Sequence, residues 1–220
     1  MVEIPSACQS VARLCLVRHG ETEWNTQRRI QGQIDVGLND KGLRQAEAAG
    51  RRLKDAGITT LYSSDLQRAW STAERIGAAI GLAPLPVPEL RERRYGIFEG
   101  LTYDEAKVRY PAAYAAMESR DPDWDGETGE SLLAHFERVA GKLKALAAAH
   151  VGESIVVVVH GGVLDIINRF VRGTPLETPR DFLIPNTGLN WIVCDGGEWR
   201  IETWGDTAHL EADALDELPT

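Results

Sequence analysis

The sequence has few cysteines and no apolar run long enough to cross a membrane. Its three cysteines, Cys8, Cys15 and Cys194, are odd in number and widely spaced, which excludes a disulfide framework and a CxxC metal site. The N-terminus lacks the basic region and the apolar stretch of a signal peptide. A membrane span needs about 20 apolar residues in succession, and no such run occurs. We therefore expect a cytoplasmic protein with no membrane partner.

The sequence also lacks a basic tract and the metal-binding patterns HxH and HExxH. The formal net charge is −9 at pH 7, and the lysines and arginines form no block of the kind that binds nucleic acid. We therefore expect no nucleic-acid partner, no bound metal and no cofactor. Because the overall charge is negative, any positive field must be local, which suits a pocket for a small anion.

Short apolar runs alternate with stretches of helical periodicity, and this order predicts an α/β fold. We expect a mostly parallel central sheet sandwiched by helices, with a C-terminal β-hairpin around the turn at residues 195–197. One domain covers residues 1–220, with a leader at 1–12 and a small helical cap insertion at about 102–129. The predicted strands are residues 14–17, 58–62, 154–159, 189–194 and 199–203, and the predicted helices lie near residues 40–56, 66–80, 103–117, 132–146 and 163–171.

Two of the predicted strands end in a histidine followed by glycine. Residues 14–17 lead into Arg18 and His19, and the very apolar run 154–159 leads into His160. Ligands bind at the carboxyl ends of strands in open α/β sheets, so parallel pairing would bring both imidazoles to one rim. The first stretch alone is equally compatible with a plain surface loop. The second strand favours a site, and the adjacent arginine indicates an anion.

Arg68 lies in the first turn of a predicted helix that Ser64 or Asp65 can cap. A cation at a helix N-terminus opposes the helix dipole, so this position is unfavourable for a purely structural arginine. It becomes favourable if Arg68 and the helix start share an anion. The alternative is a solvated surface arginine.

Together these residues have the chemistry that phosphoryl transfer needs. Arg18 and Arg68 can donate paired N–H bonds to phosphate oxygens. Neutral His19 is a competent nucleophile without a metal, and protonated His160 would supply a further donor. Glu92 is the leading candidate for the acid that protonates the leaving oxygen, although spacing does not distinguish it from three other carboxylates, Glu21, Glu89 and Glu99.

The remaining histidines have no ligand-like partner nearby in the sequence. His135 lies on a predicted helix and His150 at its end, and we expect both on the surface. His209 lies in the tail segment 206–210, where a structural role is the expectation.

From about residue 14 to residue 210 the chain resembles the histidine phosphatase superfamily, also called phosphoglycerate-mutase-like. A lone Arg-His-Gly would be weak evidence, but the whole set of motifs in this order is specific. The motifs are residues 18–22 with Asn25, residues 31–32, residues 63–66 with Arg68, residues 92–96 with Glu99 and Gly100, residues 129–131, and residues 159–162.

The resemblance implies a role for each matching residue. His19 would be the phosphorylated nucleophile, Arg18, Arg68 and His160 the phosphate pocket, and Glu92 first the proton donor and then the base that activates water. Additional substrate-binding or supporting positions implied by the motifs are Asn25, the backbone N–H of Gly161, Ser64 beside His19, Thr22, Gln31, Gly32, Arg93 and Tyr95.

The sugar-phosphate mutases of this family carry a lysine where this chain has Tyr103, and a paired arginine in the insertion. Those cations hold a substrate carboxylate, whereas the insertion here has single arginines and many acids. We interpret the chain as a member of the phosphatase branch, a metal-independent phosphomonoester hydrolase for a small phosphorylated metabolite, with inorganic phosphate as product. The alternatives are a cofactor-dependent phosphoglycerate mutase and, because no catalytic position is missing, less favourably an inactive phospho-ligand-binding protein. A homodimer is compatible with the sequence, which does not determine the oligomeric state.

Overall fold

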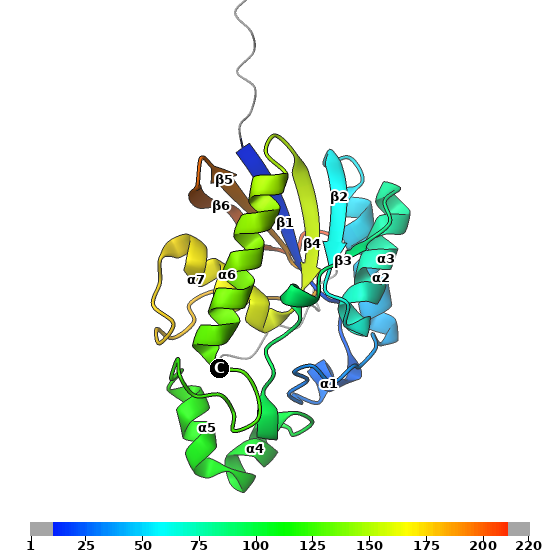
Figure 1. Cartoon of the computed structure of the whole chain (residues 1–220). Coiled ribbons are helices and arrows are strands. Elements are labelled where there is room, and N and C mark those ends of the chain that lie inside the picture. The colour runs from blue at the N-terminus through cyan, green and yellow to red at the C-terminus, as the bar shows by residue number, and fades with distance from the viewer. Residues whose placement is uncertain (1–10, 211–220) are drawn as a thin grey trace, which may run out of the picture.

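The apolar runs pair into one six-stranded sheet, in a computed structural model that describes residues 11–210 (Figure 1). The strand order is β3-β2-β4-β1-β5-β6. The first four of these pair in parallel, and β5 and β6 add an antiparallel edge, so the expected mostly parallel sheet with a C-terminal hairpin is confirmed. The strands are β1 (Val11–Arg18), β2 (Ile58–Ser63), β3 (Leu85–Pro86), β4 (Ser154–Val159), β5 (Leu189–Asp195) and β6 (Glu198–Asp206).

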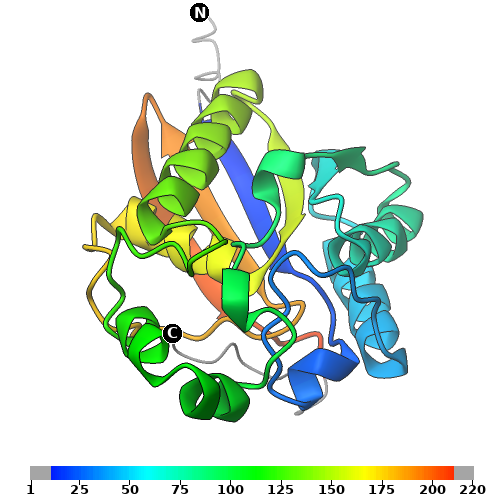
Figure 2. The ribbon, with the colours of Figure 1, turned by 60° about the horizontal axis from the view of Figure 1, so that its bottom comes forward.

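Strand β1 shows why helices cover both faces of the sheet. Alternate side chains of a strand point to opposite faces, and both faces of β1 are apolar. Leu14 and Leu16 pack with the apolar residues of α6 (Leu132–Ala149) and α7 (Gly161–Arg172). Cys15 and Val17 pack on the other side with α2 (Asp40–Leu53) and α3 (Gln67–Ile80). The sheet is therefore sandwiched by helices, as Figures 1 and 2 show from two directions.

The predicted cap insertion lies beyond the carboxyl ends of the strands, at the bottom of Figure 1. It contains α4 (Tyr103–Arg109) and α5 (Pro111–Glu118), which pack on a small aromatic cluster around the buried Phe98. We predicted one helical stretch here, and this was wrong. Pro111 has no N–H to continue the first helix, so α4 ends and the proline becomes the first residue of α5.

The remaining short elements surround the strand ends. They are α1 (Glu23–Thr26) and two 3₁₀ turns, η1 (Pro88–Leu90) and η2 (Gly96–Phe98). Thr22 and Asn25 form a capping box that closes the single helical turn of α1.

The expected leader at residues 1–12 is two residues too long, because Val11 and Ala12 already pair with Asp195 and Cys194 of β5. The rest of that leader, with Cys8, lies outside the described residues. Within residues 11–210, no helix is both long and apolar enough to cross a membrane.

Candidate active site

The parallel pairing of β1 with β4 brings the two His-Gly turns together. Arg18 is in register with Val159, and the His19 N–H donates to the Val159 carbonyl at 2.9 Å. The imidazole rings of His19 and His160 lie with their centroids 5.3 Å apart. Both side chains are buried, at the carboxyl edge of the sheet where the sequence places them.

His19 lines a hollow of about 520 Å³ that opens to solvent between the strand ends, α1 and the start of α4. We call this the first hollow. Its lining is rich in cations, although the protein is acidic overall. The residues that line it are Arg18, His19, Trp24, Asn25, Arg28, Arg29, Ile30, Gln31, Gly32, Arg68, Glu92, Tyr95 and Tyr103. His160 lies behind this lining and is fully buried.

Backbone carbonyls hold the two buried arginines of the first hollow in place. Arg18 Nη1 donates to the Ile184 carbonyl at 2.7 Å. Arg68 donates from Nη2 to the Gly32 carbonyl at 2.7 Å and from Nη1 to the Ile34 carbonyl at 3.0 Å. A guanidinium carries five N–H donors on a rigid plane, and these bonds fix that plane against the hollow. The pair therefore presents fixed N–H donors of the kind that bind a phosphate or carboxylate.

Arg68 occupies the first turn of α3, as predicted, but the predicted helix cap was wrong. Neither Ser64 nor Asp65 caps α3. The Gln67 N–H instead donates to the carboxylate of Asp35 at 2.7 Å, and Asp65 pairs with Arg91. The capping group thus comes from a loop more than thirty residues upstream, which no local pattern reveals.

The hydrogen bond of His19 determines which ring nitrogen can act. Nδ1 lies 2.8 Å from the carbonyl oxygen of Gly20. A carbonyl only accepts hydrogen bonds, so Nδ1 carries the proton and Nε2 keeps its lone pair when the ring is neutral. Burial, with Arg68 and Arg18 nearby, lowers the pKa of His19 well below its usual value, so the ring is neutral at physiological pH. Nε2 is therefore the ring nitrogen whose lone pair is available for a bond to a ligand.

His160 is likewise held neutral, because burial and then the charge of Arg68 lower its pKa. Its Nε2 lies 2.8 Å from the hydroxyl of Ser64 at the end of β2. Ser64 was expected beside His19, and the ring that its hydroxyl contacts in the structure is that of His160.

The free energy of unfolding should fall as pH drops below about 6.5, the ordinary pKa of histidine. The folded state keeps His19 and His160 neutral, whereas the unfolded chain binds a proton at each, so this stabilising difference exists above that pH and is lost below it. Urea unfolding at about pH 7.5 and about pH 5.5 would measure the loss. In a variant with both His19→Gln and His160→Gln, the free energy of unfolding should fall less between these two pH values than in the native protein. An equal fall in the two proteins would contradict the conclusion that both rings are held neutral.

Of the four candidate carboxylates, the structure brings only Glu92 to the first hollow. Its Oε1 accepts from the Arg93 N–H at 2.8 Å and its Oε2 from the Gly162 N–H at 2.9 Å, at the start of α7. The other three are committed elsewhere: Glu21 to Asn39 and Lys41, Glu89 to Lys142, and Glu99 to the N–H groups of Gln33 and Tyr95.

Gly162→Ala should displace Glu92 and lower the activity. A Cβ at Gly162 would collide with Oε1 of Glu92, so either the carboxylate or the start of α7 must shift. A misplacement of about 1 Å in a catalytic group costs on the order of 10²-fold in rate. Steady-state hydrolysis of an alkyl phosphate measures this, with Gly141→Ala on α6 as the control because a Cβ there meets no neighbour. Equal rates in both variants would refute the placement of Glu92.

The predicted supporting residues divide into three groups. Asn25, Gln31, Gly32 and Tyr95 line the first hollow. Thr22 is buried and caps α1 instead. Arg93 and Gly161 line a second, neighbouring hollow of about 480 Å³, which is bordered by Arg93, Tyr95, Met117, Arg120, Leu132, His135, Gly161, Gly162, Asp165 and Arg180.

Sequence reasoning missed the groups that hold the site from a distance. Asn186 donates to the carbonyl of His19 at 2.9 Å, and Gln33 donates to the carbonyl of Glu92 at 2.9 Å. Both lie in irregular loops, and nothing in their local sequence indicates these contacts. Residues 11–210 contain no cluster of three histidine, cysteine or carboxylate side chains that could hold a metal.

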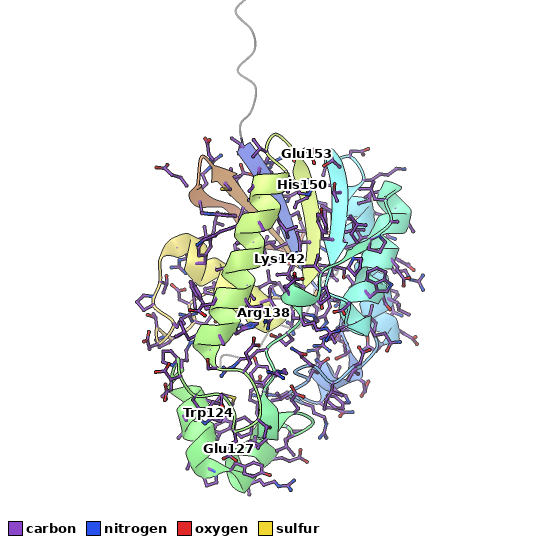
Figure 3. The ribbon with its side chains drawn as sticks, viewed as in Figure 1. Trp124, Glu127, Arg138, Lys142, His150 and Glu153 are labelled. Carbon is purple, nitrogen blue, oxygen red and sulfur yellow. The ribbon has the colours of Figure 1, made fainter. Side chains whose placement is uncertain are left out.

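The two histidines expected on the surface are not there. His135, in α6, is buried and lies beside Glu92. His150, at the other end of α6, is largely covered and lies between the Tyr62 hydroxyl at 2.9 Å and the Glu153 carboxylate at 2.7 Å (Figure 3).

Comparison with known proteins places the chain in one family. The model of the histidine phosphatase superfamily (branch 1) matches residues 14–207. The chain is 43% identical over 204 residues to phosphoglycerate mutase-like protein 4 of Arabidopsis thaliana, covering 91% of this chain and 87% of that protein. It is 39% identical over 206 residues to a metal-independent phosphoserine phosphatase of the same plant, covering 92% and 84%.

Solved structures agree with the sequence comparison. YhfR of Bacillus stearothermophilus matches with a TM-score of 0.83 and 31% identity, over 91% of this chain and all of that chain. An Entamoeba histolytica phosphoserine phosphatase variant, solved with phosphoserine, matches with a TM-score of 0.79 and 26% identity over 91% of this chain and all of that chain. From its sequence, its fold and the convergence of its motifs, the chain belongs to branch 1 of the histidine phosphatase superfamily.

Proposed function

We propose that this protein hydrolyses a small phosphomonoester through a phosphohistidine at His19, without a metal ion. The observation that carries the proposal is the orientation of His19. Its Nδ1–H is held by the Gly20 carbonyl, and its other ring nitrogen keeps a lone pair beside two buried arginines in an open hollow. The family, and the names of a metal-independent phosphoserine phosphatase and of a complex with phosphoserine among its relatives, support a phosphatase that accepts small phosphorylated ligands.

In the first step, Nε2 of His19 forms a bond to phosphorus while the bond from phosphorus to the leaving oxygen breaks. Glu92, in its protonated form, gives its proton to that oxygen, so the product leaves as an alcohol. Arg18 and Arg68 receive the charge on the remaining phosphoryl oxygens. His160, behind the His19 ring, becomes a further cationic donor once a bound phosphate compensates its burial.

In the second step, a water oxygen bonds to phosphorus and the bond from phosphorus to Nε2 breaks. Glu92, now a carboxylate, accepts the proton of the water. The step restores neutral His19 and protonated Glu92 and releases inorganic phosphate. One carboxyl group thus serves both steps from its position on the wall of the first hollow.

The state of the insertion arginines supports hydrolysis over mutase activity. Arg120 donates to the carboxylate of Asp165 at 2.5 Å and to the carbonyl of Leu176 at 2.6 Å. Arg109 lies over the ring of Tyr110, and Tyr103 occupies the wall where the mutases carry a lysine. In the described structure the insertion therefore supplies no paired arginine to the first hollow, which favours transfer of the phosphoryl group to water over its return to a bound product.

The test is phosphate release from a panel of phosphomonoesters in the presence of EDTA. The panel includes phosphoserine and 3-phosphoglycerate, and a mutase assay primed with 2,3-bisphosphoglycerate runs in parallel. We expect release that EDTA does not inhibit, without isomerisation of phosphoglycerate. Rapid isomerisation with little release would establish the mutase, and binding of phosphate esters without either reaction would establish an inactive binding protein.

A further inference from the structure

His135 is a buried imidazole with one nitrogen directed at the candidate acid. Its side chain is 1% exposed, and Nε2 lies 4.0 Å from Oε1 of Glu92. Among the described residues, no group accepts a hydrogen bond from this Nε2. A buried polar atom without a partner costs about 1–3 kcal/mol, so such an atom next to a catalytic carboxyl calls for an explanation.

The other nitrogen of His135 identifies the tautomer of the ring. Nδ1 lies 2.8 Å from Nη2 of Arg138 and 3.5 Å from Oε2 of Glu130. A guanidinium only donates hydrogen bonds, and the contact with Arg138 is the shorter of the two. Nδ1 therefore accepts, and the proton of the neutral ring lies on Nε2. His135 thus presents an N–H donor toward Glu92.

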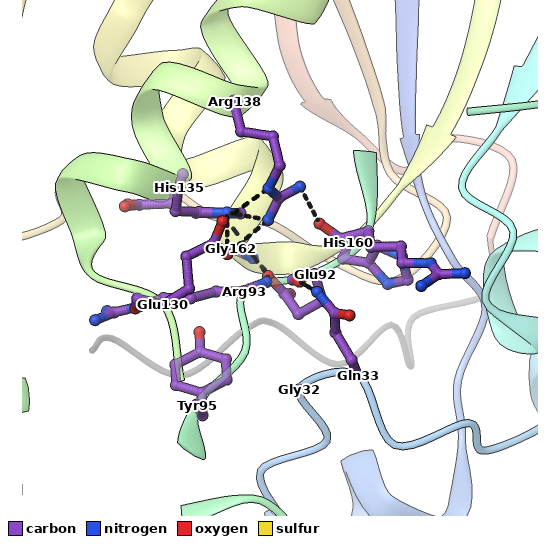
Figure 4. A network of polar contacts seen from close by, with 12 residues as sticks. Gly32, Gln33, Glu92, Arg93, Tyr95, Glu130, His135, Arg138, His160 and Gly162 are labelled. Atoms are coloured by element: carbon purple, nitrogen blue, oxygen red, sulfur yellow. Dashed lines mark hydrogen bonds and ion pairs between the residues drawn. The ribbon is translucent and has the colours of Figure 1, made fainter. Parts of the chain in front are cut away.

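Arg138 and Glu130 hold this ring rigidly, as Figure 4 shows. Arg138 donates from Nε and Nη2 to the two carboxylate oxygens of Glu130, at 2.8 and 2.7 Å. Its Nη1 donates to the carbonyls of Glu89 and Arg91, in the segment that leads directly into Glu92. Burial opposes ionisation of Glu130, but the hydrogen bonds from Arg138 outweigh it and hold the pKa of that carboxyl well below its usual range. The ion pair between Arg138 and Glu130 thus holds the His135 ring in place.

We propose that His135 is a positioning residue for Glu92, and that its Nε2–H closes onto Oε1 as the carboxyl group delivers its proton to the leaving oxygen. The proposal rests on the proposed role of Glu92 as general acid. The 4.0 Å separation is about 1 Å beyond a hydrogen bond. Catalytic hydrogen bonds are often long in the ligand-free protein and shorten when substrate binds.

The contact matters most when the leaving group is poor. Glu92 becomes a carboxylate as it gives up its proton, and a donor on Oε1 stabilises that developing charge. The N–H groups of Arg93 and Gly162 contact the same carboxylate, and His19 lines the same hollow as Glu92. An alkyl oxygen needs this proton in order to leave, whereas p-nitrophenolate leaves without it.

The experiment compares kcat/KM for phosphoserine with kcat/KM for p-nitrophenyl phosphate, because this ratio reports proton delivery to the leaving group. His135→Phe keeps the size of the ring and removes the donor. We expect a loss of about 10- to 100-fold with phosphoserine and less than about 3-fold with p-nitrophenyl phosphate. His135→Gln, which places an amide N–H near Nε2, should restore the phosphoserine value to within about 3-fold.

Two further variants make the outcome decisive. His150→Phe is the matched control, since His150 is a largely buried imidazole at the far end of the same helix (Figure 3), and it should leave the ratio unchanged. Glu92→Gln tests whether Glu92 is the general acid, and we expect it to lower kcat/KM by about 10²- to 10⁴-fold for phosphoserine but not for p-nitrophenyl phosphate. If Glu92→Gln affects the two substrates equally, the proposed function fails. If Glu92→Gln affects only phosphoserine, and His135→Phe lowers kcat/KM equally for both substrates or for neither, the role of His135 is refuted. Thermal unfolding checks each variant, and His135→Leu replaces the phenylalanine variant should that one not fold.

Discussion

Replacing His19 with alanine should lower the rate of phosphomonoester hydrolysis by about 10⁴- to 10⁶-fold, the range for loss of a nucleophile that forms a covalent intermediate. Nε2 is the ring atom with a lone pair, and His19 is the histidine that lines the first hollow beside Arg18 and Arg68. Phosphate release with saturating phosphoserine measures the loss. A rapid quench in alkaline denaturant, which preserves the P–N bond, after incubation with substrate labelled in its phosphate should recover a phosphorylated histidine from the native protein and none from His19→Ala.

His150→Ala is the control for this experiment. It removes an imidazole that is also mostly buried and hydrogen-bonded through both nitrogens, but at the opposite end of the sheet. Its activity should remain within about 3-fold of the native protein, since substitutions away from a site act mainly on stability. A His19→Ala protein that retained turnover, or labelling at another side chain, would overturn the proposed mechanism.

Arg68→Gln should lower kcat/KM by about 10²- to 10³-fold, as removal of one oxyanion donor does in other enzymes. Arg68 is 1% exposed and lines the first hollow, so its charge acts at short range and with little screening. The vanadate concentration that halves the activity should rise in parallel, because a bound oxyanion uses the same donors. Steady-state kinetics with and without vanadate measure both effects.

Arg68→Lys should recover little of this loss. A lysine carries the charge but lacks the rigid fork that binds the carbonyls of Gly32 and Ile34 and faces the hollow at the same time. Arg75→Gln, about two turns further along α3, removes an exposed arginine that pairs with Glu47 and serves as the matched control. Native-like vanadate inhibition in Arg68→Gln would show that the anion binds elsewhere.

The sequence by itself determined the sheet and the rim of the site. The runs ending at Arg18 and at Val159 are apolar on both faces, so each can only be a central strand, and parallel pairing then places His19 beside His160. Arg68 follows from the same reasoning, because its position in the first turn of α3 depends on local signals. These predictions succeed because strand and helix periodicity are properties of neighbouring residues.

Only the tertiary structure showed which carboxylate lies at the first hollow and which groups contact it. Spacing does not distinguish Glu92 from Glu21, Glu89 and Glu99, and contacts with distant partners separate them. His135 has the helical spacing of the buried stripe of α6, but that spacing does not reveal its neighbour Glu92, forty-three positions earlier. Asp35 capping α3 and Asn186 holding His19 are further contacts of this kind. Such contacts form only when the packing of the whole sheet brings distant loops together. No local stretch of the sequence therefore predicts them.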